Sequence, residues 1–274
     1  MRELSRGVAY AAMMAGGVAV TAASYMLRPE AASSLASLGT IVFWASFITL
    51  VLFRALRGEL VSAKKYLRKP AGELVFLSYL LLHLFLYGSI LAEGIALFYG
   101  KGFVIGSGLF VNYNLVPDLS LRSVFLDLFV NPSLTIQIPG VLASDLALYN
   151  FVVGFLVALL IVANFDLVSG IQSRCSRTRR WSSYVGLPVL GVLGGASCCV
   201  SVPAILAIAT PTVALAVEAY HIITLTYFGL PSATVIALAL NYRATAKVLL
   251  RTSTLSDPKF TPLPTYRLVR PNVQ

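Results

Sequence analysis

The residues with the clearest chemical potential lie close together in the last third of the chain. Cys198 and Cys199 are adjacent in an apolar run, with Gly194-Gly195 before them and Pro203 after them. Thiolates bind soft metal ions and take part in disulfide exchange. Adjacent side chains on a regular helix point about 100° apart, so both thiols can meet one ion only where the helix is distorted. Glycine and proline permit such a distortion, and the pair is therefore a candidate metal site.

Two further ligand types follow the cysteine pair. Glu218 and His221 are three residues apart, which places them on one face of a helix, a spacing that metal sites also use. In the topology derived below, these two residues and the cysteines all fall in the outer half of the membrane or at its outer edge. We therefore predict Cys198, Cys199, Glu218 and His221 as candidate ligands of a soft metal ion.

The same segment also fits a packing role. Gly191, Gly195, Cys199, Pro203 and Ala207 recur every four residues and form a stripe of small or special side chains on a helix. Such a stripe lets a neighbouring helix approach closely, so these positions are a predicted helix-packing seam. Cysteine is itself small and readily buried. A chemical role and a packing role both stay open for Cys198 and Cys199.

Few other ionisable groups interrupt the apolar sequence. His83 and Glu93 share one apolar run and are candidates for a transport path, because a charge inside a membrane is costly and is usually functional. The alternative for His83 is a structural histidine that meets a neighbouring hydroxyl or carbonyl. Haem ligation by His83 and His221 would require both at one depth, which the topology below does not provide.

These residues belong to a chain whose composition is typical of a membrane protein. It has 274 residues, of which 58% are hydrophobic and 12% are charged, whereas a soluble domain has about 25% charged residues. We predict an all-α, polytopic integral membrane helical bundle, with residues 1–251 as a single unit. Its six predicted transmembrane helices cover residues 8–27, 35–56, 74–99, 146–167, 184–209 and 221–250.

The distribution of basic residues sets the predicted topology. Six spans with both termini in the cytoplasm place 18 of the 21 Lys and Arg residues inside, including those of Arg54–Lys69 and Arg174–Arg180. Seven spans, in which residues 211–228 and 230–250 both cross, would leave 12 inside and 9 outside. Basic residues accumulate in cytoplasmic loops, so the six-span arrangement is favoured and seven spans are the alternative.

One long connection, residues 101–145, lies outside the membrane in this topology. Within it, Ser120–Val130 is apolar enough for an interfacial helix, which Asn131-Pro132-Ser133 would end. A connection of this length is usually functional or packs over the bundle as a cap. Residues 252–274 are rich in proline and are predicted to form an irregular, basic cytoplasmic tail.

The net charge of +10 indicates partners as well as topology. We expect the basic cytoplasmic loops to contact anionic lipid of the cell membrane. No basic module of a nucleic-acid binder occurs, so direct contact with nucleic acid is not predicted. Other membrane subunits or further copies of the chain are the expected protein partners.

The cysteine segment resembles a known family. The run Gly195-Ala196-Ser197-Cys198-Cys199-Val200, with Pro203, resembles the first membrane helix of the bacterial mercuric-ion transporter family, which carries a vicinal cysteine pair followed closely by proline. Val217–Tyr220 resembles the acidic-aromatic connection after that helix, and Asn241–Ala244 resembles the basic end of the family's second helix. The resemblance covers residues 194–244, and it implies that Cys198 and Cys199 receive a soft metal from outside.

Three functions follow from these observations. The first is an integral membrane transport protein that passes a soft metal ion or a small solute through the cysteine pair. The second is a non-catalytic pore or scaffold subunit of a larger envelope complex, for example one that translocates protein or nucleic acid. The third is a membrane thiol–disulfide redox protein, which adjacent cysteines disfavour because their disulfide would be strained. No nucleotide-binding, nucleophile-elbow or metalloprotease motif occurs, so we expect no ATPase within this chain and predict that it is not an enzyme.

Overall fold

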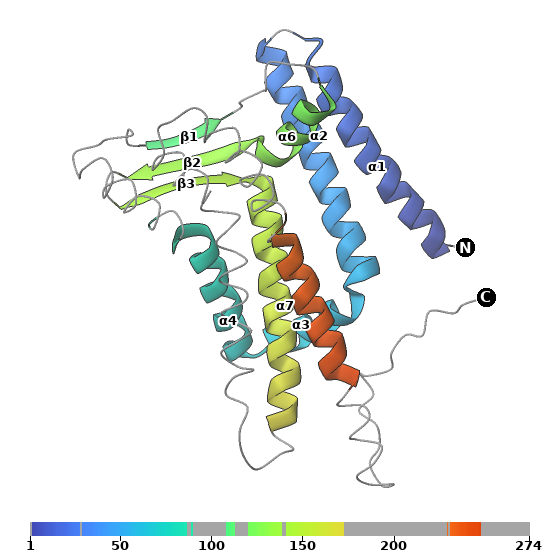
Figure 1. Ribbon diagram of the computed structural model, residues 1–274, viewed down its shortest axis with the longest axis vertical. Helices are drawn as coiled ribbons and strands as arrows, with labels where there is room; N and C mark the ends of the chain where they lie inside the picture. Colours follow the sequence, from blue (N-terminus) through green and yellow to red (C-terminus); the bar gives the residue numbers. More distant parts are fainter. Residues whose placement is uncertain are drawn as a thin grey trace, which may run out of the picture.

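The computed structural model describes residues 2–27, 29–86, 89, 108–112, 120–138, 141–172, 229 and 231–247. These residues are mostly helical, with a small sheet at one end of the bundle (Figure 1). The helices are α1 (Arg2–Ser24), α2 (Pro29–Leu50), α3 (Arg57–Leu67), α4 (Pro70–Leu81), α6 (Leu121–Val130), α7 (Leu148–Gln172) and a helix over residues 231–247. The π-helical segments η1 (Val51–Ala55) and η2 (Leu82–Leu86) extend α2 and α4.

Three of the described helices are long and apolar enough to cross a membrane. They are Ser5–Ser24, Ala31–Ala55 and Leu148–Ser169, and a shorter apolar helix covers Pro70–Phe85. These four helices overlap the first four predicted spans. The 231–247 helix falls within the sixth predicted span, whereas residues 184–209 lie outside the described residues.

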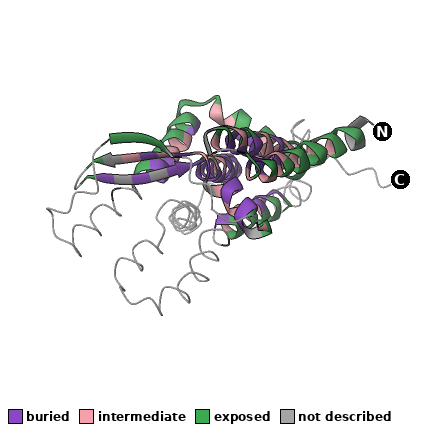
Figure 2. Cartoon of the chain, turned by 90° about the horizontal axis from the view of Figure 1, so that it is seen from above, coloured by how far each residue is buried: buried purple, intermediate pink, exposed green. Residues whose placement is uncertain are grey.

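Helix α7 forms the centre of the bundle. It contacts α2, α3, α4 and α6, and the buried residues gather around it while the outer faces of the bundle are exposed (Figure 2). In their apolar windows, 78% of α7 is buried but only 17% of α1. A helix that is apolar all round and buried belongs to the interior of a bundle. Helix α1, by contrast, presents most of its apolar surface to its surroundings.

Helices α1 and α2 form a closely packed hairpin. A Cβ at Gly17 would lie 2.7 Å from the Gly39 carbonyl oxygen, and one at Gly39 would lie 2.4 Å from Thr21 Oγ1. Only glycine leaves room for backbones this close, as at small-residue contacts between membrane helices. The hairpin therefore depends on both glycines.

The segment predicted as an outer loop contains an antiparallel sheet in the order β1-β2-β3. The strands are β1 (Gly108–Asn112), β2 (Ser133–Ile138) and β3 (Leu142–Ala147), and β3 leads directly into α7. The prediction of an all-α fold is wrong on this point. The strands are only five or six residues long, and the polar–apolar alternation in Ser133–Ile138 is the one local sign of them.

Helix α6 forms in the stretch predicted to hold an interfacial helix. It begins where the Ser120 hydroxyl accepts a hydrogen bond from the Ser123 amide at 3.1 Å, the usual way of capping a first helical turn. One face of α6 packs on α1 and α2, while Leu121 and Phe125 on the other are exposed. Together with the sheet it covers one end of the bundle, which we call the cap end; the opposite end, where α3 lies, is the α3 end (Figure 1).

Candidate functional site

Polar side chains gather where α3, α7 and the 231–247 helix meet. Most of them are buried, and the hydrogen bonds among them join all three pairs of these helices. We call this cluster the polar junction. Its members are Glu59 and Ser62 of α3, Asn164 and Asp166 of α7, and Asn241, Tyr242 and Arg243 of the 231–247 helix.

Asn164 links α7 to the 231–247 helix. Its Nδ2 donates hydrogen bonds to the carbonyl oxygens of Leu160 at 2.8 Å and Leu238 at 3.1 Å. Its Oδ1 accepts from Nδ2 of Asn241 at 2.7 Å. Asn164 is only 1% exposed, so these partners replace the water that an amide would otherwise bind. The Asn164 amide thus fixes the axial position of α7 relative to the 231–247 helix.

Asp166 links α7 to α3. The hydroxyl of Ser62 donates a hydrogen bond to Asp166 Oδ2 at 2.9 Å, and both residues are buried. Ala63, the next residue of α3, packs in an apolar cluster with α7 residues around this bond. A charge-assisted hydrogen bond in such surroundings is stronger than one in water. It therefore holds α3 against the end of α7.

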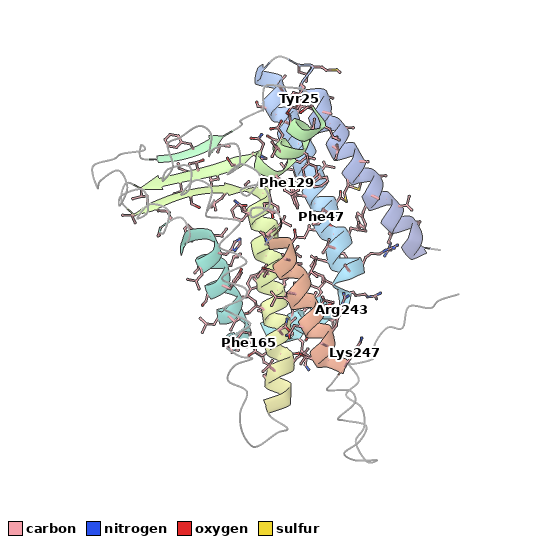
Figure 3. All side chains as sticks on the ribbon, in the orientation of Figure 1. Tyr25, Phe47, Phe129, Phe165, Arg243 and Lys247 are labelled. Carbon is pink, nitrogen blue, oxygen red and sulfur yellow. The ribbon has the colours of Figure 1, made fainter. Side chains whose placement is uncertain are left out.

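Arg243 links the 231–247 helix to α3. Its Nε lies 2.8 Å from Oε1 of Glu59, and its guanidinium also donates to the Ala55 carbonyl. The Glu59 side chain is 5% exposed and that of Arg243 is 50% exposed, so the pair lies at the edge of the protein interior. Beside it, the Tyr242 hydroxyl donates to the Gly58 carbonyl at 3.4 Å. Figure 3 shows Arg243 and Lys247 toward the α3 end, with Tyr25 and Phe129 toward the cap end.

The polar junction positions helices and does not form a metal centre. Its donors and acceptors bind one another across three elements that are distant in sequence. Among the described residues, no group of three or more His, Cys, Asp or Glu could hold a metal ion. The chemistry of the junction is thus that of a buried hydrogen-bond network, which fixes a unique arrangement of helices.

His83, a predicted transport-path candidate, is enclosed by protein. It is fully buried in η2, and its Nε2 lies 3.2 Å from the Asn150 carbonyl oxygen of α7. Because a carbonyl only accepts, Nε2 carries the hydrogen in this contact and Nδ1 faces the Tyr79 hydroxyl at 3.5 Å. A Cβ at Gly154 would lie 2.4 Å from His83 Cδ2, so the glycine makes room for the ring. These contacts are those expected of a structural histidine.

The other predicted site residues lie outside the described residues. They are the candidate ligands Cys198, Cys199, Glu218 and His221, the path candidate Glu93, and the seam residues Gly191, Gly195 and Pro203. The roles assigned to these residues therefore stay predictions.

The sequence does not predict the polar junction as a unit, although some of its members stand out from the residues around them. Asn164 and Asp166 are polar residues two positions apart in a mostly apolar span, and Glu59 is the single acidic residue of Arg54–Lys69. An isolated acid in a basic stretch has a choice of local partners. It instead contacts Arg243, 184 residues away, which no local pattern indicates.

Comparison with known proteins gives no relative. No family model matches the chain, and neither a curated protein nor a solved structure is significantly similar to it. Function must therefore be inferred from the residues and their arrangement.

Proposed function

We propose that the chain is a multi-pass transport protein of the cell membrane, with six spans and both termini in the cytoplasm. Its cargo is a soft metal ion or a small solute, and the path includes Cys198 and Cys199. The described bundle is the frame that holds the 231–247 helix in place.

The observation that carries the six-span arrangement is the parallel course of α7 and the 231–247 helix. Asn164 contacts Leu238 and Asn241, while Asp166 and Arg243, further along their helices, both contact α3. Both helices therefore run toward the α3 end. Two neighbouring spans with the same direction need an odd number of crossings between them. The six-span arrangement, with one predicted crossing by residues 184–209, agrees with this requirement. The parallel course therefore supports six spans over seven.

The position of the N-terminal helix supports a common side for both termini. A Cβ at Gly7 would lie 2.5 Å from the Arg54 guanidinium, so α1 begins near the end of η1. Arg243 contacts Ala55 of the same segment. The start of α1 and the end of the 231–247 helix thus lie at the α3 end, together with the basic residues of Arg54–Lys69. This grouping agrees with a cytoplasmic α3 end under the positive-inside rule.

The polar junction supports a role for the C-terminal segment. It anchors the helix over residues 231–247, which comes after Glu218 and His221 in the chain, and Asn241 and Arg243 within it belong to the resemblance to mercuric-ion transporters. A transport segment needs a fixed support against which to bind its cargo. The junction supplies one at the α3 end of that helix.

The cysteine pair is tested by transport into proteoliposomes. Wild-type protein should accumulate Hg²⁺ or Ag⁺, and Cys198→Ala/Cys199→Ala should lose that uptake because a soft cation needs both sulfurs. Cys175→Ala is the matched control, since it removes a thiol outside the pair and should transport normally. Normal uptake by the double variant would refute the proposed path.

The six-span topology is tested separately. In a variant with its native cysteines replaced, Thr252→Cys should resist a membrane-impermeant thiol reagent in intact cells and react after lysis. Reaction in intact cells would favour seven spans.

A second candidate is a non-catalytic pore or scaffold subunit. The ordered cap favours it, because β1, β2, β3 and α6 build a folded surface outside the three membrane-length helices. Such a subunit should co-purify with a partner protein in fixed ratio from mild detergent. It should also keep its function in the Cys198→Ala/Cys199→Ala variant.

A further inference from the structure

The exposed face of α3 concentrates positive charge. Lys64 and Lys65 lie three and four residues after Val61, and Arg68 lies three and four residues after them. This spacing places all four on one face of the helix, and all four are exposed. The opposite side of α3 is buried and carries Glu59, Ser62 and Ala63. Because Glu59 is bound to Arg243, the only acid of α3 does not neutralise the basic face.

The tight turn between α3 and α4 extends this cluster of basic residues to the start of α4. A Cβ at Gly72 would lie 2.1 Å from the Tyr66 carbonyl oxygen, so the chain reverses with no space for a larger residue. Lys69 Nζ lies 5.1 Å from the centre of the Tyr66 ring, a cation–π contact that restrains the lysine at the turn. Pro70 then begins α4. Four cations, Lys64, Lys65, Arg68 and Lys69, thus lie within six residues.

The helix that follows the turn exposes an apolar face. Leu74, Leu77 and Leu81 lie at intervals of three and four residues, and they are 67%, 55% and 57% exposed. Glu73 is an exposed acid in the first turn of α4, beside Leu74. Along the chain, the clustered cations end at Lys69 and the exposed leucines begin at Leu74, five residues later. We call these seven residues, the four cations and three leucines, the α3–α4 surface.

We infer that the α3–α4 surface binds an acidic phospholipid. The four cations would hold the phosphate headgroup, and the acyl chains would lie along the leucines of α4. Clustered Lys and Arg beside a membrane helix attract anionic lipid, at about 1 kcal/mol for each basic residue near the surface. The apolar face distinguishes a lipid from free phosphate or nucleic acid, neither of which would cover it. This inference is independent of the proposed transport path.

The test uses delipidated full-length protein in mild detergent, titrated with phosphatidylglycerol or phosphatidylcholine and followed by native mass spectrometry. Wild-type protein should retain phosphatidylglycerol preferentially. Lys64→Gln/Lys65→Gln/Arg68→Gln/Lys69→Gln should lower that preference about tenfold or more. The matched control, Arg251→Gln/Lys259→Gln/Arg267→Gln/Arg270→Gln, removes the same charge from the tail and should keep it.

Two further measurements separate a lipid from other anions. Glycerol phosphate, which has the headgroup without acyl chains, should not displace phosphatidylglycerol at equal concentration. Leu74→Ser/Leu77→Ser should weaken phosphatidylglycerol retention while the thermal unfolding of the protein stays close to wild type. Displacement by glycerol phosphate, tighter binding of an RNA oligonucleotide to the same cations, or equal loss in the tail variant would overturn the inference.

Discussion

The two ends of the bundle are held together by different physical means. At the cap end, Trp44 of α2 packs against Phe129 of α6 and Tyr149 of α7, with ring centres 5.1 and 5.5 Å apart. The indole Nε1 also donates to the Leu128 carbonyl at 2.6 Å. At the α3 end, the polar junction joins α3, α7 and the 231–247 helix mainly through hydrogen bonds. Aromatic packing thus dominates the contact at the cap end, and hydrogen bonding dominates the contact at the α3 end.

Each end nevertheless contains a buried carboxylate with hydroxyl or amide donors. Asp127 of α6 accepts from the Tyr25 hydroxyl of α1 and from Asn131 Nδ2 at 3.0 Å. Asp166 of α7 accepts from Ser62 of α3. A carboxylate without such donors would be costly to bury, so each one requires its partner helix to be in place. The comparison teaches that the polar bonds select the arrangement, while the apolar contacts supply most of the stabilising area.

The largest expected effect is at the cap end. Trp44→Ala removes the ring contacts to Phe129 and Tyr149 and leaves a cavity, which should lower the free energy of unfolding by about 3–5 kcal/mol. Thermal unfolding of the detergent-solubilised protein measures this loss. Trp44→Phe keeps an aromatic ring and should lose less. Equal losses for both variants would mean that the indole hydrogen bond, and not aromatic area, holds the cap.

A smaller effect is expected at the polar junction. Asn164→Ala leaves the Leu238 carbonyl without its side-chain donor and should cost about 1–3 kcal/mol. Asn241→Ala should cost less, because Asn241 is exposed and water can replace it. The double variant should cost less than the sum of the two single variants, since both remove the same 2.7 Å bond. Additive losses in this double-mutant cycle would show that the two amides act independently.

The His83 contact near the start of α7 tests close packing. Gly154→Ala places a methyl group against the His83 ring and should cost about 1–3 kcal/mol through overpacking. In a His83→Ala background the same substitution should cost much less, because the ring is gone. A penalty that is unchanged in that background would place the strain elsewhere on α7.

The sequence predicts these regions unequally. Hydropathy alone identifies the stretches that form α1, α2 and α7, and Ser120 with Asn131-Pro132 brackets α6, because burial in lipid and helix capping depend on local sequence. The sheet was missed because short strands depend on partners elsewhere in the chain. For example, Thr135 pairs with Phe110 on one side and Asp145 on the other.

The polar junction shows the same limit for the site. Its polar residues are visible in the sequence, but their pairing is not, since Ser62 and Asp166 are 104 residues apart. Hydrogen-bond partners at such separations follow from how helices pack, and several packings satisfy one hydropathy pattern. Of the predicted site residues, His83 alone is described. Its neighbour Tyr79 is local, four residues earlier in the chain, but its partner Asn150 of α7 is 67 residues away.

The smallest expected effect concerns the ion pair at the edge of the polar junction. Glu59→Gln keeps an oxygen that accepts from Arg243 and removes only the charge, and Arg243 is half-exposed, so solvent already screens the pair. The free energy of unfolding should therefore fall by about 1 kcal/mol or less. High salt should reduce the difference between wild type and variant further, because ions screen partly exposed charges. Ser62→Ala is the matched comparison in α3: it removes the donor to a buried carboxylate, and its larger loss should not change with salt. A salt-independent loss of several kcal/mol in Glu59→Gln would instead show that the ion pair is the main stabilising contact of the α3 end. It would also contradict the proposed order, in which the largest loss of stability occurs at the cap end.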